Sequence, residues 1–355
     1  MTSPHDQQPD QQGAGAGAPK ADAIKRIPHR ASRLRRWSIR LAIALVLLLI
    51  AGELTARFYF GLGDPPLSMA DPEIEYLFKP DQDCKRFGRH VKYNHYSMRS
   101  DDFSEPKAKR GGIRILVLGD SVINGGVLTD QEELATSIMQ KDLPARIGAP
   151  VEIGNISAGS WGPPNQLVYL KRYGLFEADA VVMVFSSHDA FDAPTFEPAV
   201  DVLPSLPSRK PISALWEGIT RYLIPKLTGK GLGLEGPPVS TPAASAEAAR
   251  VAQEKCLAAE REMIRLAKSR GAIPIVALHL TMKEQAGPLH PGHDALAQVA
   301  REEGATLIEL GPRFKSAMSD GGPNPYRDDI HPDTRGQRII AETLDDTLMP
   351  LLKRK

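Results

Sequence analysis

The sequence predicts an α/β protein: a three-layer α/β/α sandwich with a five-stranded parallel, flavodoxin-like sheet, preceded by one N-terminal transmembrane helix. From residue 111 onward, short apolar runs alternate with helical patterns, as in parallel sheets covered by helices on both faces. A basic stretch followed by an apolar run stands near the N-terminus. The length of 355 residues leaves room for one sizeable domain with appendages.

Composition excludes several classes of function. The net charge is +1, so no global field favours nucleic acid as a partner. The two cysteines, Cys84 and Cys256, fit neither a zinc site nor a redox motif. We therefore expect no metal and no cofactor, and both a disulfide between the two cysteines and two unpaired thiols stay open.

The N-terminal segment predicts a membrane anchor. We expect residues 1–38 to form a basic, disordered tail. The sequence from Lys25 to Arg40 contains no acidic residue. Residues 39–60 reach the roughly 20 residues that a membrane helix needs. Glu53 and Arg57 interrupt this run, and they stand four residues apart on one helical face where they can pair.

We interpret residues 39–60 as a signal anchor, because the basic flank is long and an A-x-A cleavage site is missing. A cleaved signal peptide and a buried helix of a soluble protein remain alternatives. Under the first two interpretations the N-terminus stays in the cytoplasm, and the chain after about residue 62 is exported. The expected location is the inner (cytoplasmic) membrane, single-pass, with the remaining chain on the periplasmic or extracellular side.

The chain after the anchor divides into two parts. Residues 61–110 predict an extended segment packed on the domain, with a strand and turn over 94–103. Residues 111–355 form the domain itself. It carries a Pro/Gly-rich insertion at 194–241, which is expected to overhang the site and to contain a small helix over 214–224.

Within the domain, apolar runs predict five strands, at 113–118, 151–156, 180–185, 273–280 and 305–310. Helical patterns predict helices at 129–143, 165–173, 241–269, 294–303 and 335–352. Thr129 with Glu132 spells a capping box for the first helix, and Thr241 is the expected cap of the third.

Two motifs carry chemistry. Gly119-Asp120-Ser121 follows the first strand, and Asp328-x-x-His331 precedes the last helix. A serine hydroxyl is a weak nucleophile unless a base takes its proton. Loops after parallel strands open on the same edge of a sheet, so the serine and the histidine can converge there.

In these two motifs, residues 111–350 resemble the SGNH/GDSL hydrolase superfamily. The resemblance implies that Ser121 is the nucleophile, His331 the general base and Asp328 its orienting acid. Ser121 as a simple helix N-cap and Asp329 as the acid are the competing interpretations. An upstream segment, Asn94 to Arg99, partly matches one found before many bacterial relatives; we expect a structural role, with Arg99 facing the substrate as the alternative.

The family's other two blocks imply an oxyanion hole. After the second strand a glycine contributes its N–H, which assigns Gly159, while a gapless match points to Ser160. After the third strand the family's Asn is replaced here by His188. A protonated ring nitrogen can donate a similar hydrogen bond, so activity should depend on pH if His188 must carry charge. An ordinary polar residue is the alternative for His188.

The resemblance implies a serine-dependent ester hydrolase acting on O-acyl groups, O-acetyl first, of a cell-surface or secreted polysaccharide. The alternatives are an O-acyltransferase with the same triad, or a catalytically weak module that binds polysaccharide or a synthase. The expected partners are an acylated carbohydrate, the inner membrane and polysaccharide synthesis machinery.

Overall fold

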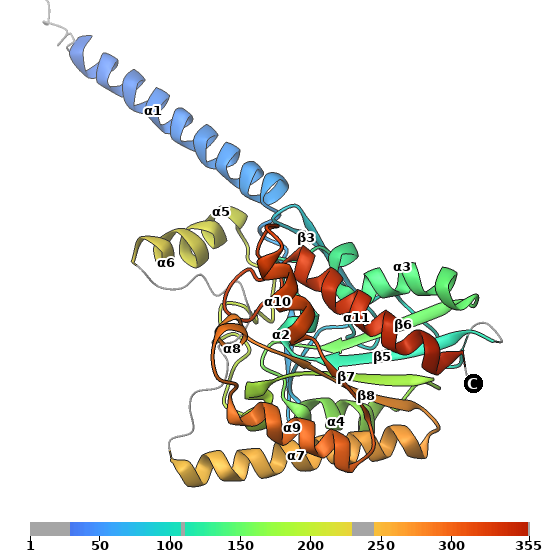
Figure 1. Ribbon diagram of the computed structural model, residues 1–355. Coiled ribbons are helices and arrows are strands. Elements are labelled where there is room, and N and C mark those ends of the chain that lie inside the picture. Colours follow the sequence, from blue (N-terminus) through green and yellow to red (C-terminus); the bar gives the residue numbers. More distant parts are fainter. Residues whose placement is uncertain (1–28, 108–110, 229–244, 354–355) are drawn as a thin grey trace, which may run out of the picture. The chain divides into compact units, whose positions relative to one another are not determined.

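The structure is a computed structural model that describes residues 29–107, 111–228 and 245–353 (Figure 1). It separates into two units, 1–50 and 51–355. Helix α1 (His29–Leu54) continues into a short π-helical turn, Thr55–Tyr59. Among the described residues, one helix, Arg33–Tyr59, is long and apolar enough to cross a membrane by length and composition.

The predicted parallel sheet is confirmed. Its strands are β5 (Ile113–Gly119), β6 (Val151–Ser157), β7 (Ala180–Ser186), β8 (Ile273–His279) and β9 (Thr306–Glu309). They pair in parallel in the order β6-β5-β7-β8-β9. Gly119 stands in register with Ser157, and Ser186 with His279, so the carboxyl ends of four strands meet at one edge.

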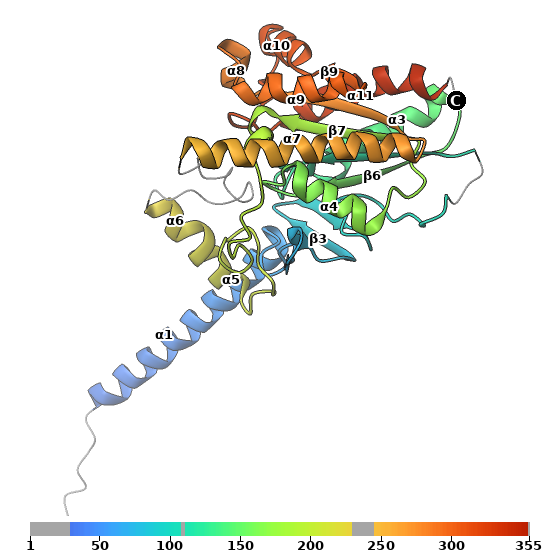
Figure 2. The same ribbon diagram turned by 90° about the horizontal axis from the view of Figure 1, so that it is seen from below.

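Helices cover both faces of the sheet, as the alternation of β5 shows. Ile115 and Val117 pack into a core with α3 (Ala135–Ile147) and α11 (Thr334–Leu352). Leu116 and Leu118 pack on the other side with the helices α4 (Pro163–Tyr173), α7 (Ala246–Ser269) and α9 (Pro291–Glu302). The three layers are seen from two directions in Figures 1 and 2. Strands buried on both faces explain their continuous apolar sequences.

Two predicted helix starts are corrected. The capping box at Thr129 is wrong: Asp130 caps a 3₁₀ turn (Gln131–Glu133), and α3 begins only at Ala135. The side chain of Thr129 instead accepts a hydrogen bond from Arg327. Thr241 lies outside the described residues, and Ser245 caps α7 by accepting from the Ala248 amide. Two short helices were not predicted, α8 (Met282–Ala286) and α10 (Gly311–Ser319).

Residues 61–110 contain two hairpins rather than an extended segment. They pair β1 (Ser68–Asp71) with β2 (Glu75–Phe78) and β3 (Gln82–Arg86) with β4 (Arg89–Tyr93). The strand expected over 94–103 is wrong, because the Asn94 carboxamide accepts from the amides of Tyr96 and Met98 and bends the chain. Arg99 is buried and binds the carbonyls of Gly126 and Thr129, so its role is structural.

The described part of the insertion contains α5 (Ala214–Glu217), a π-helical stretch (Gly218–Leu223) and α6 (Ile224–Leu227), each continuing the last. Its N-terminal part binds the first hairpin: Glu75 accepts from the amides of Thr195 and Phe196. These bonds tie it to β2. Cys84 and Cys256 are both buried and free, so they form no disulfide with each other.

Candidate active site

Ser121 lies at the turn from β5 into the short helix α2 (Ser121–Asn124). The N-cap is Asp120, whose Oδ1 accepts from the Val122 amide at 2.8 Å, so Ser121 is not the cap. A Cβ on Gly119 would lie 2.8 Å from Ile123, which explains why the turn requires glycine. The hydroxyl of Ser121 is thereby free for a partner outside its own helix.

That partner is His331, as the sequence predicts. His331 Nε2 lies 2.9 Å from Ser121 Oγ. His331 Nδ1 lies 2.7 Å from Asp328 Oδ2, and the other oxygen of Asp328 accepts from the His331 amide at 2.8 Å. The carboxylate therefore orients both the ring and the backbone of the histidine. The three side chains are hydrogen-bonded in the order Asp328, His331, Ser121, which is the geometry of a Ser-His-Asp triad.

Asp329, the competing acid, points elsewhere. Its carboxylate accepts from the Lys283 amide and pairs with Lys283 Nζ at 3.0 Å. Its carbonyl accepts from the Met282 amide at the start of α8. Asp329 therefore ties the histidine loop to α8, and Asp328 is the acid in contact with His331.

Buried polar side chains that were not predicted from the sequence fix the turn at Ser121 and the loop before His331. Gln337 of α11 donates to the Val122 carbonyl at 2.7 Å, and Asn124 donates to the Ser157 carbonyl at 2.8 Å. His279 Nε2 donates to the Ile330 carbonyl, and burial lowers the pKa of His279 to about 4, which keeps it neutral. Side-chain amides in otherwise apolar sequence were the one signal for these residues, because a buried amide needs a hydrogen-bond partner.

The loop after β6 brings Gly159 and Ser160 to this edge. The Gly159 carbonyl accepts from the buried Tyr76 hydroxyl at 2.6 Å, and Ser160 adopts a left-handed conformation with φ of 57°. A Cβ on Gly162 would lie 1.8 Å from the Asp192 carbonyl, so only glycine lets the loops after β6 and β7 approach. Tyr76, from the first hairpin, was not foreseen. The assignment of the oxyanion donor to Gly159 remains a prediction.

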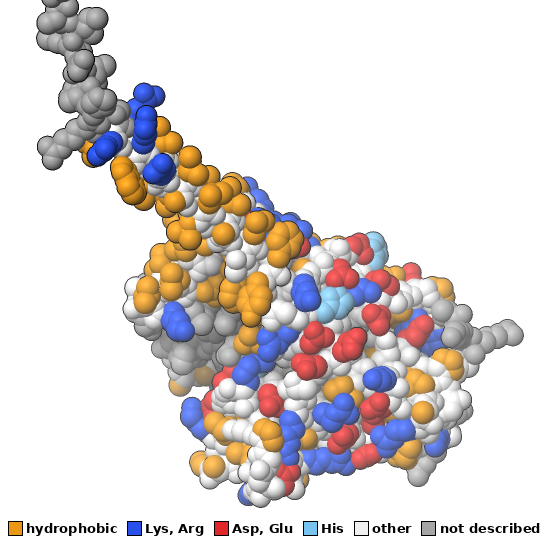
Figure 3. Space-filling model, turned by 90° about the horizontal axis from the view of Figure 1, so that it is seen from above, with side chains coloured by type: hydrophobic (Ala, Val, Ile, Leu, Met, Phe, Trp, Pro, Cys, Tyr) orange, Lys and Arg blue, Asp and Glu red, His pale blue; other side chains and the backbone are white. Residues whose placement is uncertain are grey.

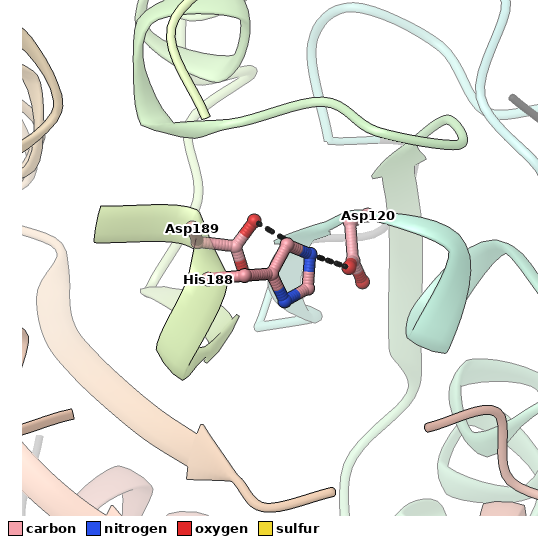
Figure 4. A group of neighbouring side chains, drawn as sticks. All are labelled: Asp120, His188 and Asp189. Carbon is pink, nitrogen blue, oxygen red and sulfur yellow. Dashed lines mark ion pairs between the residues drawn. The ribbon is translucent and has the colours of Figure 1, made fainter. Parts of the chain in front are cut away.

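His188 lies among carboxylates in the 3₁₀ helix Ser187–Phe191 that follows β7. Its Nε2 is 3.4 Å from Asp120 Oδ2, 3.8 Å from Asp189 Oδ1 and 3.7 Å from Asp192 Oδ2. Figure 4 shows Nε2 directed toward Asp120 and Asp189, while the other ring nitrogen points away from both. Asp120 precedes Ser121 in the sequence, and its carboxylate lies beside the ring of His188.

These acids set the charge of His188. Burial alone would lower its pKa, but the charges of Asp189, Asp120 and Asp192 and a bond to Asp120 raise the pKa to about 10. A histidine with this pKa stays an imidazolium throughout the neutral range. If activity requires a charged His188, its dependence on pH falls on the alkaline side, because the ring loses its charge only there.

The same cluster has the donors of a cation site. One ligand atom each from Asp120, His188 and Asp189 lies within 4.8 Å of the others. Asp120 Oδ2, His188 Nε2 and Asp189 Oδ1 are buried, and within the described parts of the chain they have no hydrogen-bond partner of good geometry. A proton on His188 supplies positive charge among these acids, as a cation would, and burial raises the pKa of Asp189 well above its ordinary value, which reduces the negative charge of the cluster.

Comparisons with known proteins give likenesses of fold. No protein-family model matches the chain, and no curated protein matches its sequence. The solved structure of TesA is 17% identical, with a TM-score of 0.42, and the match covers 67% of this chain and 99% of TesA. The acetyl xylan esterase AlAXEase is 14% identical, with a TM-score of 0.43, covering 66% of this chain and 100% of AlAXEase.

A chain from Parabacteroides merdae, described as a GDSL-like lipase, is 12% identical, with a TM-score of 0.41 and coverage of 67% and 96%. Identities and scores this low carry no argument about the chain. The structure itself shows a five-stranded parallel sheet between helices, with Gly-Asp-Ser after β5 and Asp-x-x-His before α11, in the order that the sequence predicts.

Proposed function

We propose that the protein is a serine esterase that works through a covalent acyl-Ser121 intermediate. The observation that carries the proposal is the chain of bonds from Asp328 to His331 (2.7 Å) to Ser121 (2.9 Å). His331 takes the proton of Ser121 as the hydroxyl oxygen attacks the ester carbonyl, and it returns that proton to the leaving alcohol. Water, deprotonated by His331, then attacks the acyl-enzyme and releases the acid.

The oxyanion formed in each step needs donors that are in place beforehand. We assign this role to the amides of Ser121 and Gly159 and to His188. The support for His188 is its charge: Nε2 faces the acids, and Nδ1 is left as a second N–H donor. Each such donor contributes about 3–4 kcal/mol of transition-state stabilisation.

The proposed substrate is an O-acyl ester, O-acetyl first, on a cell-surface or secreted polysaccharide, and the proposed location is the inner membrane with the domain on its outer side. The family resemblance and the potential span Arg33–Tyr59 support this. An O-acyltransferase would form the same acyl-enzyme and differ only in taking a sugar hydroxyl in place of water.

Variants at the nucleophile test the proposal. Wild-type protein should react with a fluorophosphonate probe and turn over p-nitrophenyl acetate, and Ser121→Ala should lose labelling and at least about 10³-fold in kcat. Ser269→Ala, at the exposed end of α7, is the matched control and should behave as wild type. Acetate release from acetylated polysaccharide, with and without an acceptor sugar, then separates hydrolysis from transfer.

Equal labelling of Ser121→Ala and wild type would refute the assignment of the nucleophile. A folded wild-type protein that neither labels nor turns over any ester would refute the esterase and favour a binding role.

A further inference from the structure

The helical stretch from α5 to α6 presents an apolar face to the outside. Four large apolar side chains recur at helical spacing along it and are 47–76% exposed: Trp216, Leu223, Ile224 and Leu227. Ile212, just before the helix, is fully exposed. Figure 3 shows hydrophobic side chains gathered over this part of the molecule, whereas the neighbouring face of the domain carries mixed charges.

The face turned toward the protein is the one that carries ion pairs. Glu217 is buried, pairs with Arg86 and Arg221, and accepts from the Gly63 amide at 2.6 Å. Ala214 packs there in a small cluster with Ala56 and Leu62. Leu215 and Tyr222 also pack inward against this cluster. In a soluble protein the large apolar side chains of a surface helix face inward, whereas this segment also exposes several on its outward face.

Glu53 fastens this helix to the end of the potential membrane span. Its carboxylate accepts from the amides of Ala214 (3.0 Å) and Leu215 (2.9 Å) and from the Ser213 hydroxyl (2.8 Å). These are the free N–H groups of the first turn of α5, so a residue of the span acts as the acceptor for another helix. A Cβ on Gly52 would meet Leu215 at 3.2 Å, which shows how closely the two segments approach.

We propose that the outward face of residues 212–227 lies in the headgroup region of the bilayer that the span crosses, on the side where the chain leaves it. This rests on the proposed membrane anchor. Glu53 belongs to the last part of the span, so its bond to the start of α5 links α5 to the region where the chain leaves the bilayer. The face that follows is apolar on the side that the protein does not cover.

Lipid fits this face better than a protein partner does. Phe58 and Tyr59, at the end of the span, are 79% and 76% exposed, and Trp216 adds an indole; aromatic side chains of this kind collect at membrane interfaces. Lys226, beside Leu227, can reach phosphate groups. The apolar area uncovered on a single helix matches an interfacial helix, whose apolar side enters the bilayer by about 5–10 Å.

The proposal places the catalytic domain against the membrane in a defined way. With both the span and α5–α6 attached, the domain cannot turn freely about its anchor. Its substrate would then have to reach the site close to the membrane surface.

Depth-dependent quenching on the full chain tests this. The full-length protein, with cysteine introduced at Leu223 and labelled with NBD, is reconstituted into phosphatidylcholine–phosphatidylglycerol vesicles. The native cysteines Cys84 and Cys256 are buried, so we expect the label not to react with them. The wild-type protein is treated with the label in the same way as a control. Nitroxides near the headgroup should quench the probe at residue 223 strongly, and nitroxides at the acyl-chain ends should quench it weakly.

Two matched positions give the controls. A probe at Leu47, within the apolar run, should be quenched most by the deep nitroxides. A probe at Glu254, exposed on α7, should not be quenched. Fluorophosphonate labelling of Ser121 in the same vesicles reports separately on the esterase.

Quenching at Leu47 without quenching at Leu223 would overturn the inference and leave the anchor standing. Quenching at neither position would overturn both. A blue-shifted probe at Leu223 that lipid nitroxides do not quench would show that a protein, not the bilayer, covers this face.

Discussion

The two carboxylate oxygens of Asp120, the residue before Ser121, have different neighbours. One oxygen caps the helix that begins at Ser121, and the other faces His188. Burial by itself would raise the pKa of Asp120, but the bond to His188 and its charge lower it, so the carboxylate stays ionised. Opposite charges stabilise each other in a buried site, so the imidazolium of His188 is favoured by Asp189 and also by Asp120, the residue next to the serine.

The charge of His188 predicts an alkaline limb in the pH profile. Its raised pKa means that the imidazolium is present below about pH 10 and is lost above it. If His188 donates to the oxyanion, kcat/KM should fall as pH rises through about 10, and not between pH 7 and 9. His188→Asn should remove this limb and leave a rate within about 10²-fold of wild type, because the amide can donate in its place.

Controls separate this from global effects. His90→Asn changes an exposed histidine of β4 and should leave the profile unchanged. EDTA at pH 7.5 should leave the rate unchanged, because His188 is protonated there and no metal ion is needed between Asp120 and Asp189. An alkaline limb that persists in His188→Asn, or activity lost to EDTA and restored by a divalent cation, would contradict the proposed role of the imidazolium.

Among the helices, α7 contains a buried acid that the mechanism does not use. Glu260 is fully buried, and both its oxygens lack a hydrogen-bond partner in the described parts of the chain. Burial raises the pKa of Glu260 from 4.5 to about 9. The folded protein therefore holds a proton here that the unfolded chain releases above pH 4.5, and the free energy of unfolding falls as pH rises from there toward 9.

Glu260→Gln should remove this dependence. We expect the variant to be more stable than wild type by about 1–3 kcal/mol at pH 8 and nearly equal to it at pH 4.5. Urea unfolding at both pH values measures the difference. Glu262→Gln, two residues along on the exposed side of α7, is the control and should shift stability by less than about 0.5 kcal/mol at either pH. A Glu260→Gln variant that is less stable at pH 8 would show that the carboxylate has a partner.

The molecule as a whole separates near residue 50, since residues 51–355 form one compact unit with the complete triad. A fragment of these residues should fold alone and keep kcat/KM on p-nitrophenyl acetate within about twofold of the full chain. The full chain should resist alkaline carbonate extraction from membranes, whereas the fragment, which lacks most of the span, should be extracted by carbonate. A fragment that loses esterase activity while remaining folded would show that the anchor takes part in forming the site.

Local patterns were sufficient to predict the sheet and the contact of Ser121 and Asp328 with His331. Buried parallel strands have continuous apolar sequences, so all five were predictable, and parallel strands deliver their loops to one edge, so Ser121 and His331 could be expected to meet. The N-cap residues of two helices were predicted wrongly. Asp130 and Ser245 took the capping roles because several side chains near each start can accept a backbone N–H, and packing selects among them.

Contacts between remote segments could not be predicted. Glu53 and Arg57 do pair, as their spacing suggested, but the same carboxylate caps α5, far along the chain. The sequence predicts His188 as a donor in place of Asn, but it does not show that Asp120 and Asp189 both lie against the ring. A strand or a motif consists of consecutive residues, so the sequence by itself determines it. The charge of a side chain depends on the carboxylates and the solvent within a few ångströms, and only the tertiary structure brings those groups together.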